Sequence, residues 1–253
     1  MSDAVASFAT AAGIWGLPLP PHFRDDFSLH VTRPAKTPLS LRPGIICHRM
    51  HLSPHDVVAL QNGIRVTSPL RTMLDLAAVL QRDDIVAIGD YLVCEHPEDF
   101  PAPRNALYRL DQIATYLAAK RRVRGLPGAK RALELVRVGA DSVPETRLRL
   151  AIIDAGLPEP VLNYVIRDSF GRAVAWPDQA FVEARLSVQY DGEHHRTAEQ
   201  QASDNWRNRL VADEEWDQLI VSSTDVRRRG WDGVARLVGQ RLSRLRHRAE
   251  LSA

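Results

Sequence analysis

The sequence has few cysteines and no long apolar run, and both absences limit what the protein can be. Its 253 residues include two cysteines, Cys47 and Cys94, which is too few for a disulfide framework and fits a reducing cytoplasm. No apolar run approaches the roughly 20 residues of a membrane-spanning helix, so we expect a cytoplasmic protein with no membrane partner. No basic residue precedes Arg24, which is atypical of a signal peptide. A short packed helix over Val5–Ile14 is the better interpretation.

Lysine is scarce as well. It supplies three of the 33 basic residues, which face 31 acidic residues and leave a formal net charge of +2. The chain as a whole is therefore not a polycation, although arginine suits bidentate phosphate contacts wherever it clusters. The apolar content of 45% and the charged content of 25% are ordinary for a globular protein. A chain of this length can bury one large core or two modest ones.

The order of apolar runs and turn residues divides the chain into two halves, with a seam at 138–141. In the first half, strands are expected at Phe27–Thr32, Ile45–His48 and Ile64–Thr67. Two serine motifs, Ser53-Pro-His-Asp56 and Ser68-Pro69, predict the starts of helices. Further helices are expected at about 84–94, 110–119 and 130–138, with Gly125-Leu-Pro-Gly128 breaking the chain between the last two. The expected fold class is α/β.

The second half predicts a short β-hairpin whose open end carries polar and acidic side chains. Within the strand Arg185–Asp191, one face receives Leu186, Val188 and Tyr190 and the other receives Ser187, Gln189 and Asp191. If the partner strand is Val174–Ala180 and the chain reverses near Glu183-Ala184, Asp178 lies opposite Gln189. Gly192 then turns the chain into His194 and His195.

Carboxylates beside imidazoles at one strand end are what metal-assisted phosphodiester hydrolysis needs. Hard Mg²⁺ takes oxygen ligands and keeps several waters, one of which a neighbouring base can deprotonate. Each residue also has an ordinary structural role. Ser142 to Glu145 fits a helix capping box, with Pro144 in the first turn, and Asp191-Gly192 is a common turn dipeptide. A Glu145 folded back on its cap cannot bind a metal directly, so its capping role competes with a role as a metal ligand. The co-occurrence of these residues at one strand end nevertheless favours a metal site.

The same residues belong to an ordered series of motifs: Ser142-Val-Pro-Glu145, Ala155-Gly-Leu-Pro158, Pro177-Asp178, Gln189-Tyr-Asp-Gly192, His194-His195 and Asp204-x-x-Arg207. Over residues 140–226 the series resembles the PD-(D/E)XK nuclease superfamily, in particular the branch similar to very-short-patch-repair endonucleases. The resemblance implies a restriction-endonuclease-like fold and a Mg²⁺ (or Mn²⁺) site that cuts DNA.

The resemblance also implies a role for each residue of the site. Asp178 would be the principal metal ligand, with Asp191 and Gln189 as secondary ligands or water-positioning groups. Glu145 would act through an outer-shell water, and His195, or else His194, would serve as general base or acid because imidazole titrates near neutral pH. Arg207 would hold Asp204 or a phosphate.

Two positions depart from the pattern of the superfamily. Gln189 stands where the branch usually has glutamate, and an amide oxygen brings no charge to a metal. Asp191 stands at the position of the superfamily lysine, which the repair-type branch also lacks.

The first half has a second resemblance. The runs Ala11–Pro20, His30-Val-Thr32 and Val66–Leu76 look like abortive-infection (AbiEi-type) antitoxin-like proteins, but without the winged helix-turn-helix that usually begins them. The expected organisation is therefore an antitoxin-like α/β region over 1–138 and a nuclease-like domain over 139–253.

Two further clusters suggest binding sites. Cys47-His48-x-x-His51-x-x-x-His55 contains zinc ligand types, but structural zinc sites usually pair two short spacers on separate segments, so a buried cysteine and surface histidines are the default. Near the C-terminus, Arg227, Arg228 and Arg229 precede Trp231 and combine charge with a stacking surface for nucleic acid. The helix expected from Trp231 to about His247 carries further arginines, for which a solvated amphipathic helix is the commoner explanation.

Two functions are consistent with these patterns. The first is a metal-dependent DNA endonuclease, with DNA as its partner. The second is a catalytically impaired DNA-binding or antitoxin-like regulatory protein, with a toxin or a repair protein as the partner. Gln189 and the missing winged helix support the second.

Overall fold

The computed structural model describes residues 4–36, 42–96, 98, 100, 102–192 and 209–252. The chain forms two compact units, each considered separately below. The N-terminal unit comprises Met1–Val93 and Ala106–Arg137, and the C-terminal unit comprises Cys94–Asn105 and Val138–Ala253. The second boundary falls at the expected seam, whereas Cys94–Asn105, expected in the first half, groups with the C-terminal unit.

The N-terminal unit contains a five-stranded sheet in the order β3-β2-β1-β5-β4. Its strands are β1 (Val5–Ala6), β2 (Leu29–Arg33), β3 (Ile45–Arg49), β4 (Val57–Ala59) and β5 (Arg65–Thr67). β2 pairs in parallel with β3 and β1 in parallel with β5, while the β1–β2 and β4–β5 pairs are antiparallel. The three predicted strands match β2, β3 and β5 within two residues. β1 was not predicted, because a two-residue strand has no period to detect.

The helices of this unit are α1 (Phe8–Trp15), α2 (Pro21–Arg24), α3 (Pro69–Leu76), α4 (Arg82–Val93), α5 (Leu110–Ala119) and α6 (Leu126–Leu133). The Ser68 cap is confirmed, since its hydroxyl accepts a hydrogen bond from Arg71 N. A break between α5 and α6 is present, as expected, but it ends at Gly125, because residues 126–128 already belong to α6. Gly125 is the N-cap at φ 88°, and a Cβ there would lie 2.7 Å from Leu74 O and Ala78 N, so only glycine fits.

The helix expected after Ser53 is also wrong. The capping box is present, with the Asp56 carboxylate accepting from Ser53 N at 2.9 Å, but it opens one 3-10 turn (Pro54–Asp56) that leads directly into β4. β-Branched Val57 and Val58 pair with β5 instead of continuing a helix. Tertiary pairing therefore overrides a correct local cap signal.

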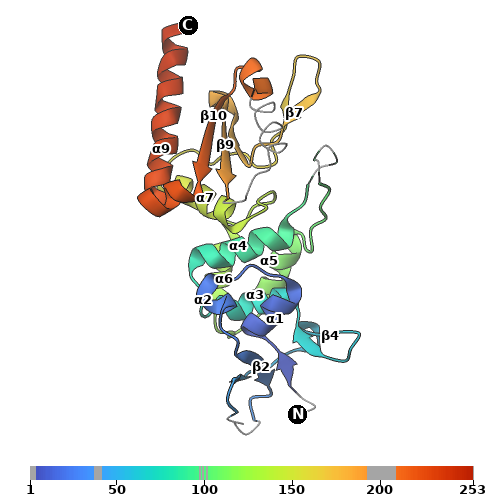
Figure 1. Ribbon diagram of the computed structural model, residues 1–253. Coiled ribbons are helices and arrows are strands. Elements are labelled where there is room, and N and C mark those ends of the chain that lie inside the picture. Colours follow the sequence, from blue (N-terminus) through green and yellow to red (C-terminus); the bar gives the residue numbers. More distant parts are fainter. Residues whose placement is uncertain are drawn as a thin grey trace. The chain divides into compact units, whose positions relative to one another are not determined.

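The C-terminal unit contains a three-stranded sheet in the order β10-β9-β8 (Figure 1). β8 (Gln179–Phe181) runs antiparallel to β9 (Leu186–Asp191), and β10 (Asp217–Ser222) runs parallel to β9. The predicted strand Val174–Ala180 is divided in two: β7 (Ala173–Ala175) pairs with β6 (Ile166–Arg167), and β8 pairs with β9. The chain reverses through a 3-10 turn at Val182–Ala184, as expected, and Arg185 follows in the left-handed region.

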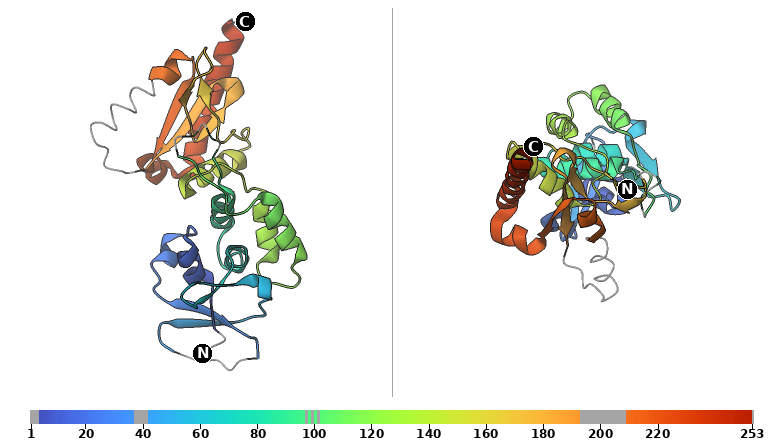
Figure 2. Two further views of the ribbon diagram at one scale, coloured as in Figure 1. Left: turned by 90° about the vertical axis from the view of Figure 1, so that its right-hand side faces the viewer. Right: turned by 90° about the horizontal axis from the view of Figure 1, so that it is seen from above.

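Helices α7 (Val143–Asp154) and α9 (Ser223–Ser252) complete this unit, and residues 209–213 are also helical (Figure 2). α9 contains a non-helical residue, Gly230, and Arg227–Arg229 lie in the helical segment that precedes it. Among the residues that the structure describes, no helix is both long and apolar enough to cross a membrane.

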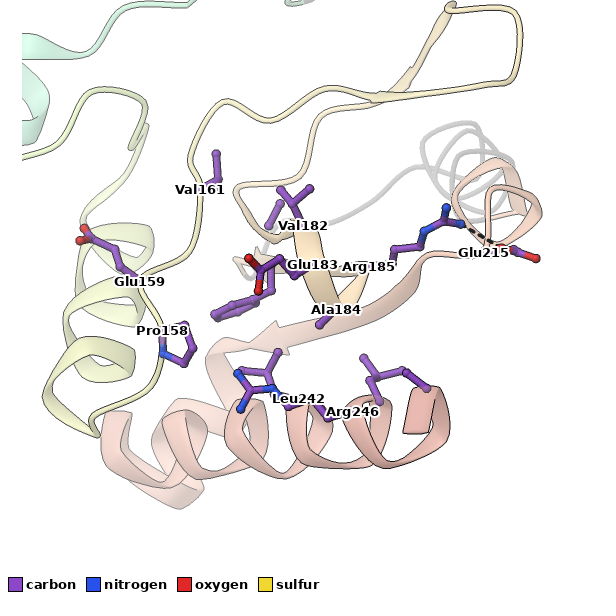
Figure 3. Close-up of a pocket in the computed structure, with 14 residues that line it drawn as sticks. Pro158, Glu159, Val161, Val182, Glu183, Ala184, Arg185, Glu215, Leu242 and Arg246 are labelled. Carbon is purple, nitrogen blue, oxygen red and sulfur yellow. Dashed lines mark hydrogen bonds and ion pairs between the residues drawn. The ribbon is translucent and has the colours of Figure 1, made fainter. Parts of the chain in front are cut away.

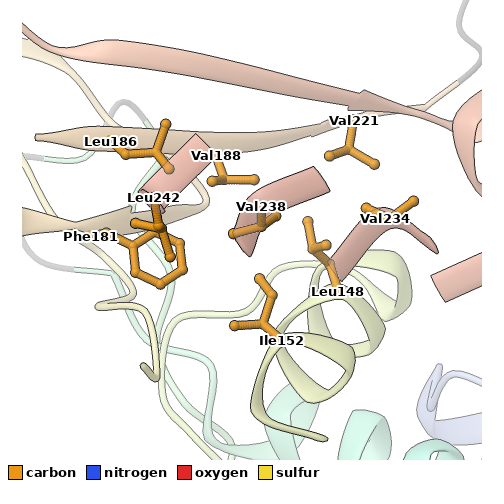
Figure 4. Packing of buried hydrophobic residues seen from close by; sticks show 9 residues of the cluster. All are labelled: Leu148, Ile152, Phe181, Leu186, Val188, Val221, Val234, Val238 and Leu242. Atoms are coloured by element: carbon orange, nitrogen blue, oxygen red, sulfur yellow. The ribbon is translucent and has the colours of Figure 1, made fainter. Parts of the chain in front are cut away.

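One hydrophobic cluster joins the two helices to the sheet (Figure 4). It draws on α7, β9, β10, α9 and the end of β8: Leu148, Ile152, Phe181, Leu186, Val188, Val221, Val234, Val238 and Leu242. Each such side chain contributes about 1.5–3 kcal/mol when fully buried. The alternation predicted for β9 is confirmed, because Leu186 and Val188 are fully buried in this cluster and Tyr190 packs against it. The protein is therefore α/β, and the core fixes which face of β9 carries its polar side chains.

Candidate functional site

Asp178 lies immediately before β8, at the end of the sheet where β9 finishes. Gln179 pairs with Val188, so extending the register by one residue places Asp178 opposite Gln189, as predicted. Its Oδ2 accepts a hydrogen bond from Tyr190 N at 2.7 Å, which fixes the carboxylate against β9. Burial raises the pKa of Asp178 to about 6, the Tyr190 hydrogen bond opposes this rise, and the charge of Asp141 adds to it.

Glu145 lies in the first turn of α7 and faces back toward its own cap. Ser142 Oγ donates to Glu145 Oε1 at 2.7 Å, Asp141 N donates to Oε2 at 2.9 Å, and Glu145 N donates to Ser142 Oγ at 3.3 Å. The predicted cap is thus present, with the backbone of Asp141 in place of that of Ser142 as the donor to the glutamate. Both carboxylate oxygens already have a donor, which suits a role through water better than direct coordination of a metal.

Glu145 and Asp178 influence each other electrostatically. Burial raises the pKa of Glu145 to about 7, and the negative charge of Asp178 is the second cause. Gln179 connects their two elements, since its fully buried side chain donates from Nε2 to Glu145 O at 2.9 Å. We refer to Glu145 and Asp178 as the carboxylate pair. Within the described part of the chain, no arginine or lysine forms an ion pair with either carboxylate.

Gln189 and Asp191 occupy the other face of β9 and are half-buried. Gln189 Oε1 accepts a hydrogen bond from Gln218 Nε2 on β10 at 3.2 Å, so the amide oxygen expected to bind metal already has one protein donor. An amide oxygen has two lone pairs, and one remains for another partner. Asp191 ends β9 opposite Ser222.

Two predicted residues, His195 and Arg207, lie outside the described residues, together with His194 and Asp204. Arg227, Arg228 and Arg229 are exposed on the first part of α9, before Gly230. Arg227 donates to Ser223 Oγ and Thr224 Oγ1. Trp231 was expected to offer a stacking surface for nucleic acid beside the arginine charges. Instead, it packs against the hydrophobic cluster and lies near Tyr190.

The histidines near Cys47 do not form a metal centre. The His48 ring stacks on Phe8 at 3.9 Å between centroids, and its Nε2 lies 3.0 Å from His30 Nδ1. Cys47 is half-buried rather than buried. Burial lowers the pKa of His48 to about 4, and His30 adds to this effect. Burial also lowers the pKa of His30, so His48 is neutral at physiological pH and the stacked rings help to pack the N-terminal unit.

Three potential metal ligands that the sequence patterns did not predict lie beside the carboxylate pair: Cys94, His96 and Asp141. Their ligand atoms all lie within 4.8 Å of one another, and the described residues contain no second such group of three. The spacing Cys94-x-His96 was a readable signal, but Asp141 lies too far along the chain to be linked to it by spacing.

A separate pocket of about 660 Å³ lies at the other end of the β8–β9 pair (Figure 3). It is lined by the turn residues Val182, Glu183 and Ala184 and by Leu242 and Arg246 of α9. None of the predicted site residues lines it, so this pocket does not serve the carboxylate pair.

Comparisons with known proteins add relatives but no function. No protein-family model and no solved structure matches the chain. Two curated Mycobacterium tuberculosis proteins are similar to it: "Uncharacterized protein MT2308" of strain CDC 1551 / Oshkosh and "Uncharacterized protein Rv2248" of strain ATCC 25618 / H37Rv. Each is 27% identical over 232 residues, which cover 89% of this chain and 76% of the relative. Neither printed name states a function.

Proposed function

We propose that the C-terminal unit is a divalent-metal-dependent DNA endonuclease with a restriction-endonuclease-like fold. The observation that carries the proposal is the carboxylate pair, which is partly buried and has raised pKa values but no cationic partner among the described residues. Two carboxylates that repel each other favour binding of a cation, because the cation removes the repulsion. The order α7, antiparallel β8 and β9, then β10 parallel to β9 supports the proposed fold.

The residues present suit a hard cation. Tyr190 N holds Asp178 Oδ2, and Oδ1 has no hydrogen-bond donor among the described residues. Asp191 and the second lone pair of Gln189 provide further oxygen donors. Oxygen-only ligands match Mg²⁺ or Mn²⁺. When bound, such an ion polarises a phosphoryl oxygen and lowers the pKa of a coordinated water.

The chain contributes the remaining functions in this proposal. Asp178 holds the ion, Gln189 and Asp191 orient water, and Glu145 accepts a hydrogen bond from a water of the outer shell. Gln179 keeps the first turn of α7 in place through Glu145 O. His195 accepts or returns the proton of the attacking water, and Arg207 with Arg227–Arg229 contacts DNA phosphates.

A specific observation supports the second candidate, a catalytically impaired DNA-binding or antitoxin-like protein that acts on a toxin or repair partner. Gln189 is uncharged and is hydrogen-bonded to Gln218, so the site has one carboxylate fewer than the resemblance implies. A protein that cuts DNA with Mn²⁺ but not with Mg²⁺ would be a weakened endonuclease, because Mn²⁺ accepts neutral donors such as the Gln189 amide more readily.

Plasmid nicking distinguishes the two functions. The purified protein should convert supercoiled plasmid to the open circle in the presence of Mn²⁺ or Mg²⁺ and not in the presence of EDTA. Asp178→Asn should abolish this activity while leaving the far-UV circular dichroism spectrum unchanged. Asp232→Asn, which changes an exposed acid of α9, is the matched control and should retain activity. Equal nicking by Asp178→Asn and the parent, or no nicking by the parent with either ion, would reject the endonuclease.

A further inference from the structure

A second group of potential metal ligands, of a different chemical type, lies next to the carboxylate pair. Cys94 Sγ is 3.3 Å from Asp141 Oδ1, His96 Nε2 is 2.8 Å from Asp141 Oδ2, and Cys94 Sγ is 3.9 Å from His96 Nε2. Cys94 is fully buried and the His96 side chain is 7% exposed, whereas the Asp141 side chain is 43% exposed. The group is thus enclosed on the sulfur and imidazole side and open to solvent on the carboxylate side.

These separations fit a tetrahedral ion. Zinc holds sulfur at about 2.3 Å and nitrogen or oxygen at about 2.0–2.1 Å, so tetrahedral donors lie about 3.3–3.6 Å apart. The three observed distances, from 2.8 to 3.9 Å, bracket this range. The sulfur distance is to Oδ1 and the imidazole distance is to Oδ2 of the same carboxylate, so an ion held by one of these oxygens would need the Asp141 carboxylate to rotate as the three ligands close on it.

The hydrogen bonding of His96 is a second, independent observation that suits a metal ligand. Its Nδ1 lies 2.7 Å from Ala102 O, and a carbonyl oxygen can only accept, so Nδ1 carries a hydrogen. In the neutral imidazole, Nε2 is then an acceptor that faces another acceptor, Asp141 Oδ2. Either a second proton or a metal ion must lie between them. A histidine that binds a metal through Nε2 usually donates its Nδ1–H to a backbone carbonyl, a carboxylate or a water, and His96 has such a carbonyl partner in Ala102 O.

The donor types select the ion. Thiolate, imidazole and carboxylate together suit borderline-soft Zn²⁺, whereas Mg²⁺ prefers oxygen alone. Arg104 Nη1 contacts Asp141 Oδ1 at 3.1 Å, which leaves Oδ2 for the ion. Binding would release the thiol proton of Cys94 to the solvent, and three protein ligands leave the fourth coordination position to water.

We propose that Cys94, His96 and Asp141 bind one Zn²⁺ ion, which fastens the segment Cys94–Asn105 to the start of α7. The backbone N–H of Asp141 donates to Glu145 Oε2, so the ion would also fix the position of Glu145. The site does not depend on whether Asp178 binds Mg²⁺ or whether the protein cuts DNA.

Metal content and thiol protection test the proposal on the full-length protein. After incubation with Zn²⁺ and extensive dialysis, the parent should retain one equivalent by inductively coupled plasma mass spectrometry. Co²⁺ in its place should produce a thiolate charge-transfer band in the near ultraviolet. Cys94→Ser and His96→Gln should retain no more than about a tenth of an equivalent, whereas the matched controls Cys47→Ser and His51→Gln should retain the full equivalent.

Protection of the thiol keeps the test decisive if the variants fold poorly. In the parent, Zn²⁺ should slow alkylation of Cys94 at least tenfold, as followed by peptide mass spectrometry, and should leave the rate at Cys47 unchanged. Excess Mg²⁺ should protect neither thiol. A parent that retains no zinc and shows equal alkylation rates with and without Zn²⁺ would overturn the proposal and identify the group as a hydrogen-bonded imidazolium.

Discussion

The two units bury carboxylates in opposite ways. In the N-terminal unit, Arg71 is 2% exposed and donates to Asp56 at 3.1 Å and to Asp75 at 2.8 Å, and Tyr116 and Lys120 also donate to Asp56. In the C-terminal unit, the carboxylate pair receives backbone N–H and hydroxyl donors but forms no ion pair with a cation among the described residues. The first cluster supplies its own positive charge, and the second does not.

The comparison shows that a raised pKa alone does not identify a binding site. Burial raises the pKa of Asp75 to about 6 although Arg71 opposes this, and that value matches the one for Asp178. What differs is the neighbouring charge, an Arg71 guanidinium that lowers the pKa of Asp75 and an Asp178 carboxylate that raises the pKa of Glu145. The contrast supports a structural role for the Arg71 cluster and agrees with the proposal that the carboxylate pair binds an external cation.

The largest expected effect comes from removing the internal cation. Arg71→Met should lower the free energy of unfolding by about 3–5 kcal/mol, because it leaves two buried carboxylates without their shared partner. Urea denaturation followed by tryptophan fluorescence measures the loss. Arg121→Met, at an exposed position of the same unit, should change stability by no more than about 0.5 kcal/mol. A loss below about 1 kcal/mol for Arg71→Met would contradict a structural role for the cluster.

An intermediate effect, with a defined dependence on pH, is expected at the carboxylate pair. Its folded pKa values, about 7 for Glu145 and about 6 for Asp178, lie above the values of about 4 in an unfolded chain. The stability that protonation provides is therefore complete below about pH 4 and is lost as the pH rises through 6 and 7. Asp178→Asn removes the repulsion and should gain about 1–2 kcal/mol over the parent at pH 8 without metal, and less at pH 5.

Thermal denaturation at the two pH values, with EDTA and with Mg²⁺, measures this difference. Mg²⁺ should raise the melting temperature of the parent at pH 8 and should have little effect on Asp178→Asn. An equal response of the two proteins to Mg²⁺ would show that Asp178 does not face a bound ion.

The smallest expected effect concerns Gln189. Gln189→Glu retains an acceptor for Gln218 Nε2 and replaces a dipole with a charge beside Asp178. We expect the affinity for Mg²⁺ to rise about tenfold, or about 1.4 kcal/mol, and the melting temperature without metal at pH 8 to fall because the carboxylates repel. Isothermal titration calorimetry measures the change in affinity for Mg²⁺, and thermal denaturation measures the change in melting temperature. Gln218→Glu, on the neighbouring strand, is the matched control, and an equal gain in affinity there would indicate only a general effect of charge.

Local patterns in the sequence predicted the elements that make up the carboxylate pair. The alternation of Leu186, Val188 and Tyr190 identified the buried face of β9, and the reversal near Glu183 brought Asp178 opposite Gln189. The Ser142 cap followed from the residue types alone. All of these signals span fewer than about a dozen residues, within which periodicity and turn chemistry act directly.

Signals that depend on distant parts of the chain were missed or misread. The cap at Ser53 was correct, but pairing with β5 converted the helix expected after it into a strand. The break predicted at 125–128 exists, but α6 begins within it, at Leu126, and the sequence does not show that Leu74 and Ala78 approach Gly125 closely enough to require glycine there. Asp141 could not be associated with Cys94 and His96, since only the tertiary fold brings them together.

The parallel pairing of β9 with β10 has a consequence for the order in which the protein assembles. Parallel neighbours cannot be joined by a tight turn, so β9 and β10 pair across a long separation in sequence, and such non-local pairings form slowly. The cluster that holds α7 on the sheet also needs Val234, Val238 and Leu242 of α9. On the ribosome, the carboxylate pair can therefore reach its buried arrangement only after α9 has emerged, so a partly synthesised chain would lack the site.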